Sequence, residues 1–154
     1  MDLADTINQF HEAHSRHDLD SLLAYMAEDV VIRFPTSPQA IHGKESIRPV
    51  WSMVFRTVIP DIRQEVLATL TQGRTASCEL VETGTLTIPP AVAESLSLAP
   101  GGRPYTLHMS SFFHFDEAGL IDSIRSYWDT GSFAEQIGID IDVIRSLQER
   151  AHVA

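Results

Sequence analysis

The sequence predicts an α+β fold in which a curved antiparallel sheet is wrapped on N-terminal helices. Apolar residues recur every three or four positions near the N-terminus, at Leu3, Ile7, Phe10 and His14, which is the period of an amphipathic helix. After Pro60 the period changes to two, as in half-buried strands. Helices followed by a meander of long strands are typical of the α+β class, and a curved sheet over helices leaves a concave hollow at one end.

The N-terminal elements follow from local signals. The first helix is expected over residues 3–17, and a second over LDSLLAYMA, between Asp18 and about Glu28. A β-branched strand, Val30–Phe34, is stopped by Pro35. A third helix opens at Gly43 and carries Ile47, Trp51 and Phe55 on one face, with Pro49 early enough to be tolerated.

The second part of the chain predicts four long strands, at residues 62–70, 75–86, 104–115 and 120–128. Gly73 turns the first strand into the second, and a tight turn at Asp116–Gly119 joins the last two. The proline-flanked connection IPPAVAESLSLAPGG holds at most a short helical turn, and Asp129 is expected to cap the first of two short terminal helices.

Composition favours one acidic globular domain spanning residues 1–154. The net charge of −10 argues against nucleic acid or an anionic membrane as partner. The start, MDLAD, lacks the features of a signal peptide, and no apolar run approaches the ~20 residues that span a bilayer. A cytoplasmic protein is therefore expected. The single cysteine, Cys78, excludes an internal disulfide.

Several segments in order carry a resemblance to a known family: HDLDSLLAYMAEDVVIRFP, IHGKESIRPVW, TGTLTIPP, GGRPY and FFHFDEAGLIDSIRSYWDTGSFAEQIG. Together they resemble the SnoaL-like, ketosteroid-isomerase-like branch of the nuclear-transport-factor-2-like superfamily. The resemblance implies a cone-shaped α+β barrel with an apolar pocket, paired as a homodimer through the outer face of the sheet.

The resemblance also locates the family's catalytic positions. The three that serve ketosteroid isomerases fall on Phe10, Phe34 and Ser111, and phenyl rings cannot carry a proton. The acidic position of polyketide cyclases and epoxide hydrolases falls on Ser126, which does not titrate near neutral pH. The chain is therefore not expected to be a standard ketosteroid isomerase. Trp51 falls where relatives carry an aromatic pocket residue.

Strand parity predicts the pocket wall. If Ser111 faces inward, so does Phe113, and Ser126 brings Trp128 inward on the last strand. The wall is then formed by aromatic side chains, namely Phe10, Phe34, Trp51, Phe113 and Trp128. Such a wall suits a small, flat, apolar molecule. The alternative is that these rings fill the cone as ordinary core.

Glu82 and His14 are the candidate catalytic residues. Glu82 shares the parity of Cys78 and Leu80, which would place a carboxylate on an apolar face and raise its pKa. Alternatively, a bulge at Gly84 turns Glu82 to solvent. His14 lies on the apolar stripe of the first helix, either as a titrating base or as a half-exposed residue that caps helix carbonyls.

The remaining candidates do not point to a cofactor. The seven histidines show no pair with a carboxylate at metal-ligand spacing, so no metal and no cofactor are predicted. His108 and His114 have outer-face parity. The function that the resemblance and the predicted apolar pocket imply is proton-transfer chemistry on an apolar polyketide- or terpenoid-like metabolite of secondary metabolism: cyclisation, isomerisation, dehydration or epoxide opening. The alternative is a non-catalytic ligand-binding or dimerisation module.

Overall fold

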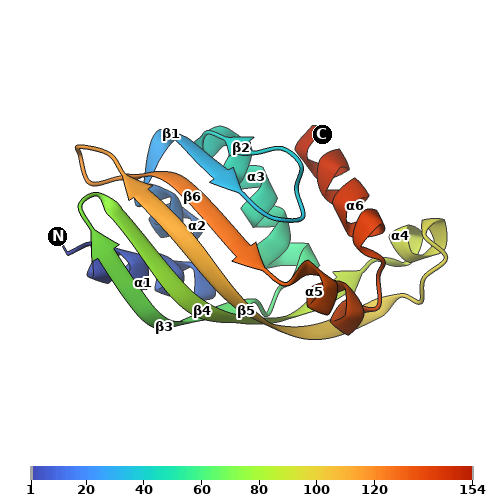
Figure 1. Cartoon of the computed structure of the whole chain (residues 1–154). Coiled ribbons are helices and arrows are strands. Elements are labelled where there is room, and N and C mark those ends of the chain that lie inside the picture. Colours follow the sequence, from blue (N-terminus) through green and yellow to red (C-terminus); the bar gives the residue numbers. More distant parts are fainter. Residues whose placement is uncertain (1, 154) are drawn as a thin grey trace.

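A curved, mixed sheet forms the body of the protein in the computed structural model, which describes residues 2–153 and the side chains of residues 2–147 (Figure 1). Within the described chain the sheet has six strands in the order β2-β1-β6-β5-β4-β3. These are β1 (Met26–Arg33), β2 (Ile41–His42), β3 (Arg63–Gln72), β4 (Thr75–Ile88), β5 (Gly101–Phe115) and β6 (Ile121–Trp128).

The four long strands pair antiparallel in sequence order, β3 with β4, β4 with β5 and β5 with β6, as predicted. β1 then joins β6 in parallel, which the sequence pattern did not indicate. The sheet ends at β2 and β3 without closing on itself. The predicted α+β class with a curved sheet on N-terminal helices is confirmed.

Helices cover the inner side of the sheet, and further helices form the C-terminal part of the chain (Figure 1). They are α1 (Leu3–Ser15), α2 (Leu19–Ala24), α3 (Lys44–Met53), α4 (Pro90–Ser95), α5 (Thr130–Ile137) and α6 (Ile141–Val153), with a π-helical turn at Val54–Val58. Asp2, Asp18 and Asp129 cap α1, α2 and α5 by accepting backbone N–H bonds. The predicted cap at Asp129 is thus confirmed. None of the described helices is long and apolar enough to cross a membrane.

The second helix ends four residues earlier than predicted, at Ala24 rather than near Glu28. The backbone N–H of Ile121 donates to the Tyr25 carbonyl over 2.8 Å, and Met26 pairs with Ile121 on β6. Pairing with β6 and burial of the Met26 side chain therefore outweigh the helical preference of this segment.

The turn between β5 and β6 forms at the predicted residues. Gly119 has a positive φ of 81°, a conformation that favours glycine. The Asp116 carboxylate accepts a bond from the backbone N–H of Leu120 over 2.9 Å. This turn sets which side chains of β6 face the helices.

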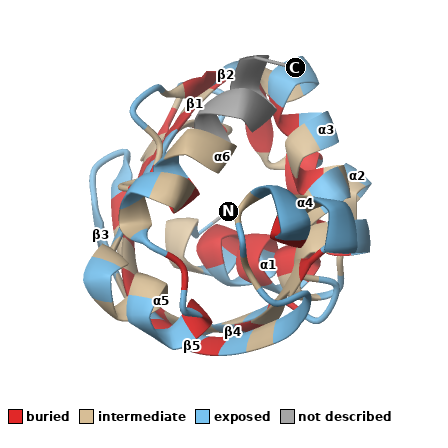
Figure 2. Ribbon diagram, turned by 90° about the vertical axis from the view of Figure 1, so that its right-hand side faces the viewer, coloured by how far each residue is buried: buried red, intermediate tan, exposed pale blue. Residues whose placement is uncertain are grey.

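The inner face of the sheet is buried and the outer face is exposed (Figure 2). On β5 the buried set confirms the predicted parity: Tyr105, Leu107, Met109, Ser111, Phe113 and Phe115. On β6 Ser126 is buried as predicted, and Trp128 on the same face is partly buried. The side chains that could meet a ligand therefore lie between this inner face and the helices.

Candidate functional site

The five aromatic residues predicted to wall a pocket lie in two groups. Phe10 and Phe113 meet edge to face, with ring centroids 5.7 Å apart, and both are fully buried. The ring centroid of Phe34 lies 5.9 Å from that of Trp51 and 5.9 Å from that of Trp128. Trp51 is buried, whereas Phe34 and Trp128 are partly buried. The first group has the packing of ordinary core, whereas the second keeps part of its aromatic surface accessible.

A pair of hydroxyl groups lies between these two aromatic groups. Ser111 and Ser126 are cross-strand partners, and their Oγ atoms are 2.8 Å apart in a buried contact. Cys78 is the partner of Ser111 on the other side of β5. One serine donates to the other, so the second hydroxyl hydrogen is left for another acceptor.

Glu82 lies on the inner side of β4, half-buried, with both carboxylate oxygens hydrogen-bonded. The Tyr105 hydroxyl donates to Oε1 over 2.9 Å, and Nε2 of Gln64 donates to Oε2 over 2.7 Å. The alternative of a bulge at Gly84 is not seen, since the β4–β5 register runs without a shift from Glu82 to Gly84.

The surroundings of Glu82 shift its proton affinity. Burial raises the pKa of its carboxyl group above the ordinary value, and the bonds from Gln64 and Tyr105 offset part of that rise. Burial and the adjacent Glu82 charge raise the pKa of Tyr105, so its hydroxyl remains a donor. A carboxyl group of this kind can both accept and release a proton nearer neutral pH than an exposed one.

His11 extends this network and was not among the predicted site residues. Its Nδ1 lies 2.7 Å from Oε1 of Gln64, and its Nε2 lies 3.6 Å from the Cys78 sulfur. Burial lowers the pKa of His11 to about 4, an effect that the Gln64 bond partly opposes, so the imidazole is neutral at pH 7. Burial also raises the pKa of the Cys78 thiol to about 12.

The signals for His11 and Gln64 were present in the sequence but weak. His11 follows Ile7 by four residues and so shares its helix face, and Gln64 alternates in phase with Ile62 and Val66.

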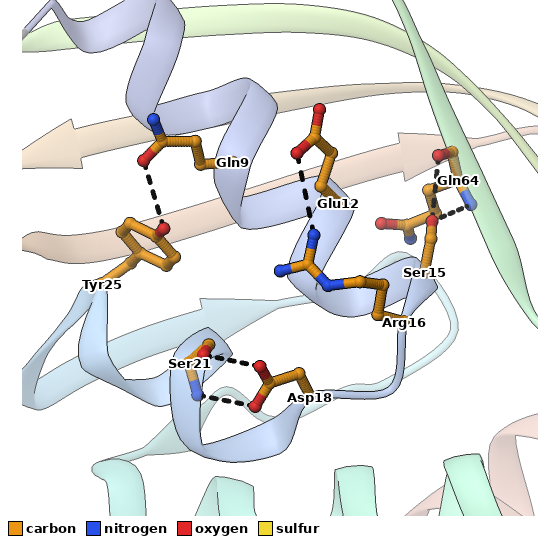
Figure 3. Close-up of polar contacts among 8 residues, drawn as sticks. All are labelled: Gln9, Glu12, Ser15, Arg16, Asp18, Ser21, Tyr25 and Gln64. Atoms are coloured by element: carbon orange, nitrogen blue, oxygen red, sulfur yellow. Dashed lines mark hydrogen bonds and ion pairs between the residues drawn. The ribbon is translucent and has the colours of Figure 1, made fainter.

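The backbone of Gln64 is held by hydrogen bonds to Ser15 in the last turn of α1. Ser15 Oγ accepts from the Gln64 N–H over 2.8 Å and donates to the Gln64 carbonyl over 3.0 Å (Figure 3).

His14 is buried rather than half-exposed, so the capping alternative is wrong. Its ring meets Phe55 edge to face with centroids 5.1 Å apart, and its Nδ1 has no hydrogen-bond partner among the described residues. Burial, followed by the nearby His11 and His17, lowers the pKa of His14 to about 3. An imidazole with this pKa is a weak base at neutral pH.

A cavity lies at the C-terminal end of the molecule, away from Glu82 and the serine pair. It has a volume of about 250 Å³ and is lined by Leu96, Asp142, Val143, Ser146 and Leu147, none of which belongs to the predicted pocket wall. Among the residues whose side chains are described, no three His, Cys, Asp or Glu side chains converge as a metal site requires.

This architecture is shared with solved structures of the ketosteroid-isomerase-like fold. A protein described as having that fold, from Catenulispora acidiphila and in complex with trimethylamine, is 16% identical with a TM-score of 0.69. The match covers 89% of this chain and 95% of that one.

A family model for the SnoaL-like domain matches residues 7–124, and the chain belongs to this family. A proposed polyketide cyclase from Xanthomonas campestris has a TM-score of 0.72 at 21% identity, covering 88% of this chain and 96% of that one. IdmH, a proposed polyketide cyclase from Streptomyces antibioticus, has a TM-score of 0.69 at 24% identity, covering 90% and 100%. No curated protein matches the chain by sequence.

Proposed function

We propose that this protein is an enzyme that needs no cofactor and uses Glu82 as an acid–base group in proton-transfer chemistry on an apolar, polyketide-like metabolite. The observation that carries the proposal is the Glu82 carboxylate on the inner face of the sheet, bonded to Tyr105 and Gln64. Among the described residues its hydrogen-bond partners are neutral, so burial raises its pKa without an opposing cation.

A ring closure illustrates the chemistry available to such a group. The carboxylate of Glu82 removes a proton from a carbon next to a substrate carbonyl and leaves an enolate. The enolate carbon then bonds to a second carbonyl carbon of the same molecule, whose oxygen becomes an alkoxide. Glu82, now a carboxylic acid, returns the proton to that alkoxide, so atoms and charge balance. Isomerisation and dehydration use the same first step.

The spacing of polar groups favours an elongated substrate. Glu82 pairs with Leu107 on β5, four residues from Ser111, and four residues of strand span about 13 Å. Glu82 and the Ser111–Ser126 pair are therefore too far apart to act on one atom. They would contact opposite ends of one molecule, with the apolar side chains of Leu80, Met109 and Trp128 between them.

The aromatic group of Phe34, Trp51 and Trp128 supports binding of a flat ring. Nε1 of Trp128 is buried without a partner among the described residues, and an indole N–H can only donate. A carbonyl or phenol oxygen on the substrate would satisfy it. Steroid isomerisation by the family's usual residues is not proposed, because Phe10, Phe34 and Ser111 occupy those positions.

The test is turnover of a panel of linear and partly cyclised polyketides by the wild-type protein and Glu82→Gln. This change keeps the side-chain shape and removes the titration. We expect turnover to fall by about 10²-fold or more while the Kd, followed by quenching of Trp51 and Trp128 fluorescence, changes little. Glu79→Gln is the matched control, since Glu79 is exposed on the same strand.

Unchanged turnover in Glu82→Gln would refute the role of Glu82. Ligand binding without any turnover by the wild-type protein would favour the alternative of a non-catalytic binding module.

A further inference from the structure

We infer that His11 is a positioning residue that fixes which way the Gln64 amide faces, and through that amide controls the proton affinity of Glu82. The inference rests on the proposed function only in calling Glu82 the acid–base group. The relay itself is a property of the unliganded protein.

Two contacts join His11 to Glu82, both through the side-chain amide of Gln64. His11 is 4% exposed, and its Nδ1 lies 2.7 Å from Oε1 of Gln64. The Gln64 amide nitrogen donates to Oε2 of Glu82 over 2.7 Å. His11 and Glu82 therefore act on the two ends of one amide group.

The hydrogen-bond roles along this path are linked. A neutral imidazole has one N–H and one lone pair, and an amide has one acceptor end and one donor end. With the proton on Nδ1, His11 donates to Oε1, so the amide NH₂ group must face Glu82. In the opposite orientation the amide oxygen would face a carboxylate oxygen, which is repulsive whenever Glu82 is ionised.

Cys78 completes the path at the other ring nitrogen. Its thiol lies 3.6 Å from Nε2 of His11 and is able to donate weakly to that lone pair. This contact favours the Nδ1–H tautomer, and hence the amide orientation that stabilises ionised Glu82. Because the thiol pKa is raised to about 12, Cys78 stays protonated and its role does not change near neutral pH.

The backbone anchor leaves the amide little other freedom. Ser15 holds both the N–H and the carbonyl of Gln64, as Figure 3 shows, so the remaining choice is the direction of the side-chain amide. The other titratable groups near the path are Tyr105 from β5, Asp61 before β3, and His14 and His17 of the α1 end. Of these, Tyr105 contacts Glu82 directly and is expected to act independently of His11.

The test compares His11→Asn with His11→Leu. The Asn amide nitrogen replaces the Nδ1 donor, whereas Leu fills similar space and cannot donate. The readout is the Glu82 pKa in the unliganded protein, from the carboxyl ¹³C resonance that disappears in Glu82→Gln. We expect His11→Leu to raise this pKa by up to about one unit, the limit reached if the Gln64 amide no longer donates to the carboxylate, and His11→Asn to restore it.

An unchanged Glu82 pKa in His11→Leu would overturn the inference, as would equal shifts in both variants. If His11→Leu does not fold, the ¹⁵N resonances of His11 in the wild-type protein decide: the Nδ1–H tautomer supports the relay, and the Nε2–H tautomer refutes it. These readouts do not use activity, so full turnover by Glu82→Gln would refute the proposed function and leave this inference standing.

Discussion

The Tyr105 hydroxyl reaches Glu82 because position 84 of the neighbouring strand is glycine. Tyr105 donates to Oε1 of Glu82 over 2.9 Å, and Gly84 is its cross-strand partner. A Cβ atom at Gly84 would lie 3.0 Å from the Tyr105 oxygen and 2.5 Å from Cγ2 of Ile59. The tyrosine–carboxylate contact therefore depends on the absence of a side chain at this position.

Replacing Tyr105 by Phe should raise the Glu82 pKa further, because it removes a donor that stabilises the carboxylate. If Glu82 acts as a base, the acidic limb of the pH–rate profile should move to higher pH. Carboxyl ¹³C titration measures the shift directly. Tyr127→Phe on the exposed face of β6 is the control, and a lowered or unchanged Glu82 pKa in Tyr105→Phe would contradict the prediction.

Gly84→Ala should destabilise the protein by about 1–3 kcal/mol, the usual cost of overpacking a filled site. The strain is steric rather than conformational, since Gly84 does not have a positive φ. Urea unfolding measures the loss. Adding Ile59→Ala should recover part of it, because the tightest contact is with that side chain. Simple additivity of the two losses would show that Ile59 is not the obstacle.

Acid should destabilise the fold through His11 and His14. In the folded protein the pKa is about 4 for His11 and about 3 for His14, below the ordinary 6.5. Burial of these neutral imidazoles therefore lowers the stability of the fold in acid: stability is fully retained above pH 6.5 and is lost as the pH falls towards 4 and 3. At pH 5 each histidine should lower the free energy of unfolding by about 2 kcal/mol. The reason is that its imidazole is protonated in the unfolded chain and neutral in the folded protein. The raised pKa of Glu82 has the opposite effect, because it adds to the free energy of unfolding as the pH falls.

Urea unfolding at pH 7 and pH 5 checks this dependence. His14→Leu should lose markedly less stability than the wild-type protein between the two pH values. His108→Asn, at an exposed position, should lose as much as the wild-type protein. An equal loss in His14→Leu and the wild-type protein would exclude His14 as a source.

The Ser111–Ser126 contact should appear as coupling in a double-mutant cycle. Either single change to Ala leaves one buried hydroxyl without its partner, at a cost of about 1–3 kcal/mol. The double change removes both groups, so its cost should be smaller than the sum of the single changes. Additive costs in urea unfolding would mean that each hydroxyl has another partner.

A homodimer through the outer face of the sheet remains a prediction. Phe112 is 38% exposed, Tyr127 is 51% exposed, and the two rings meet edge to face with centroids 6.1 Å apart. Phe112→Glu should convert a dimer to a 17 kDa species in sedimentation at micromolar concentration, whereas Met53→Glu at the end of α3 should not. A wild-type protein that sediments as the 17 kDa species would refute the dimer.

For Glu82, periodicity left the alternative of a bulge at Gly84 open. It was sufficient, with turn chemistry, for the fold class, the four long antiparallel strands and the shared parity of Ser111 and Phe113. These properties are local, because a side chain on a strand alternates faces whatever it packs against. The early end of α2 was not predictable in this way. It depends on pairing between Met26 and Ile121, which are far apart in the chain.

Only the tertiary structure decided which polar groups meet. Gln64 is 53 residues from His11 and 18 from Glu82, and it contacts both because β3 lies beside β4 and is tied to α1 by Ser15. The burial of His14 and the division of the aromatic wall into two groups likewise depend on how α1 and α3 sit on the sheet. Sequence alone thus determined which residues of a strand share a face. The partners across that face, and hence the pKa of each group, depend on long-range packing that periodicity does not encode.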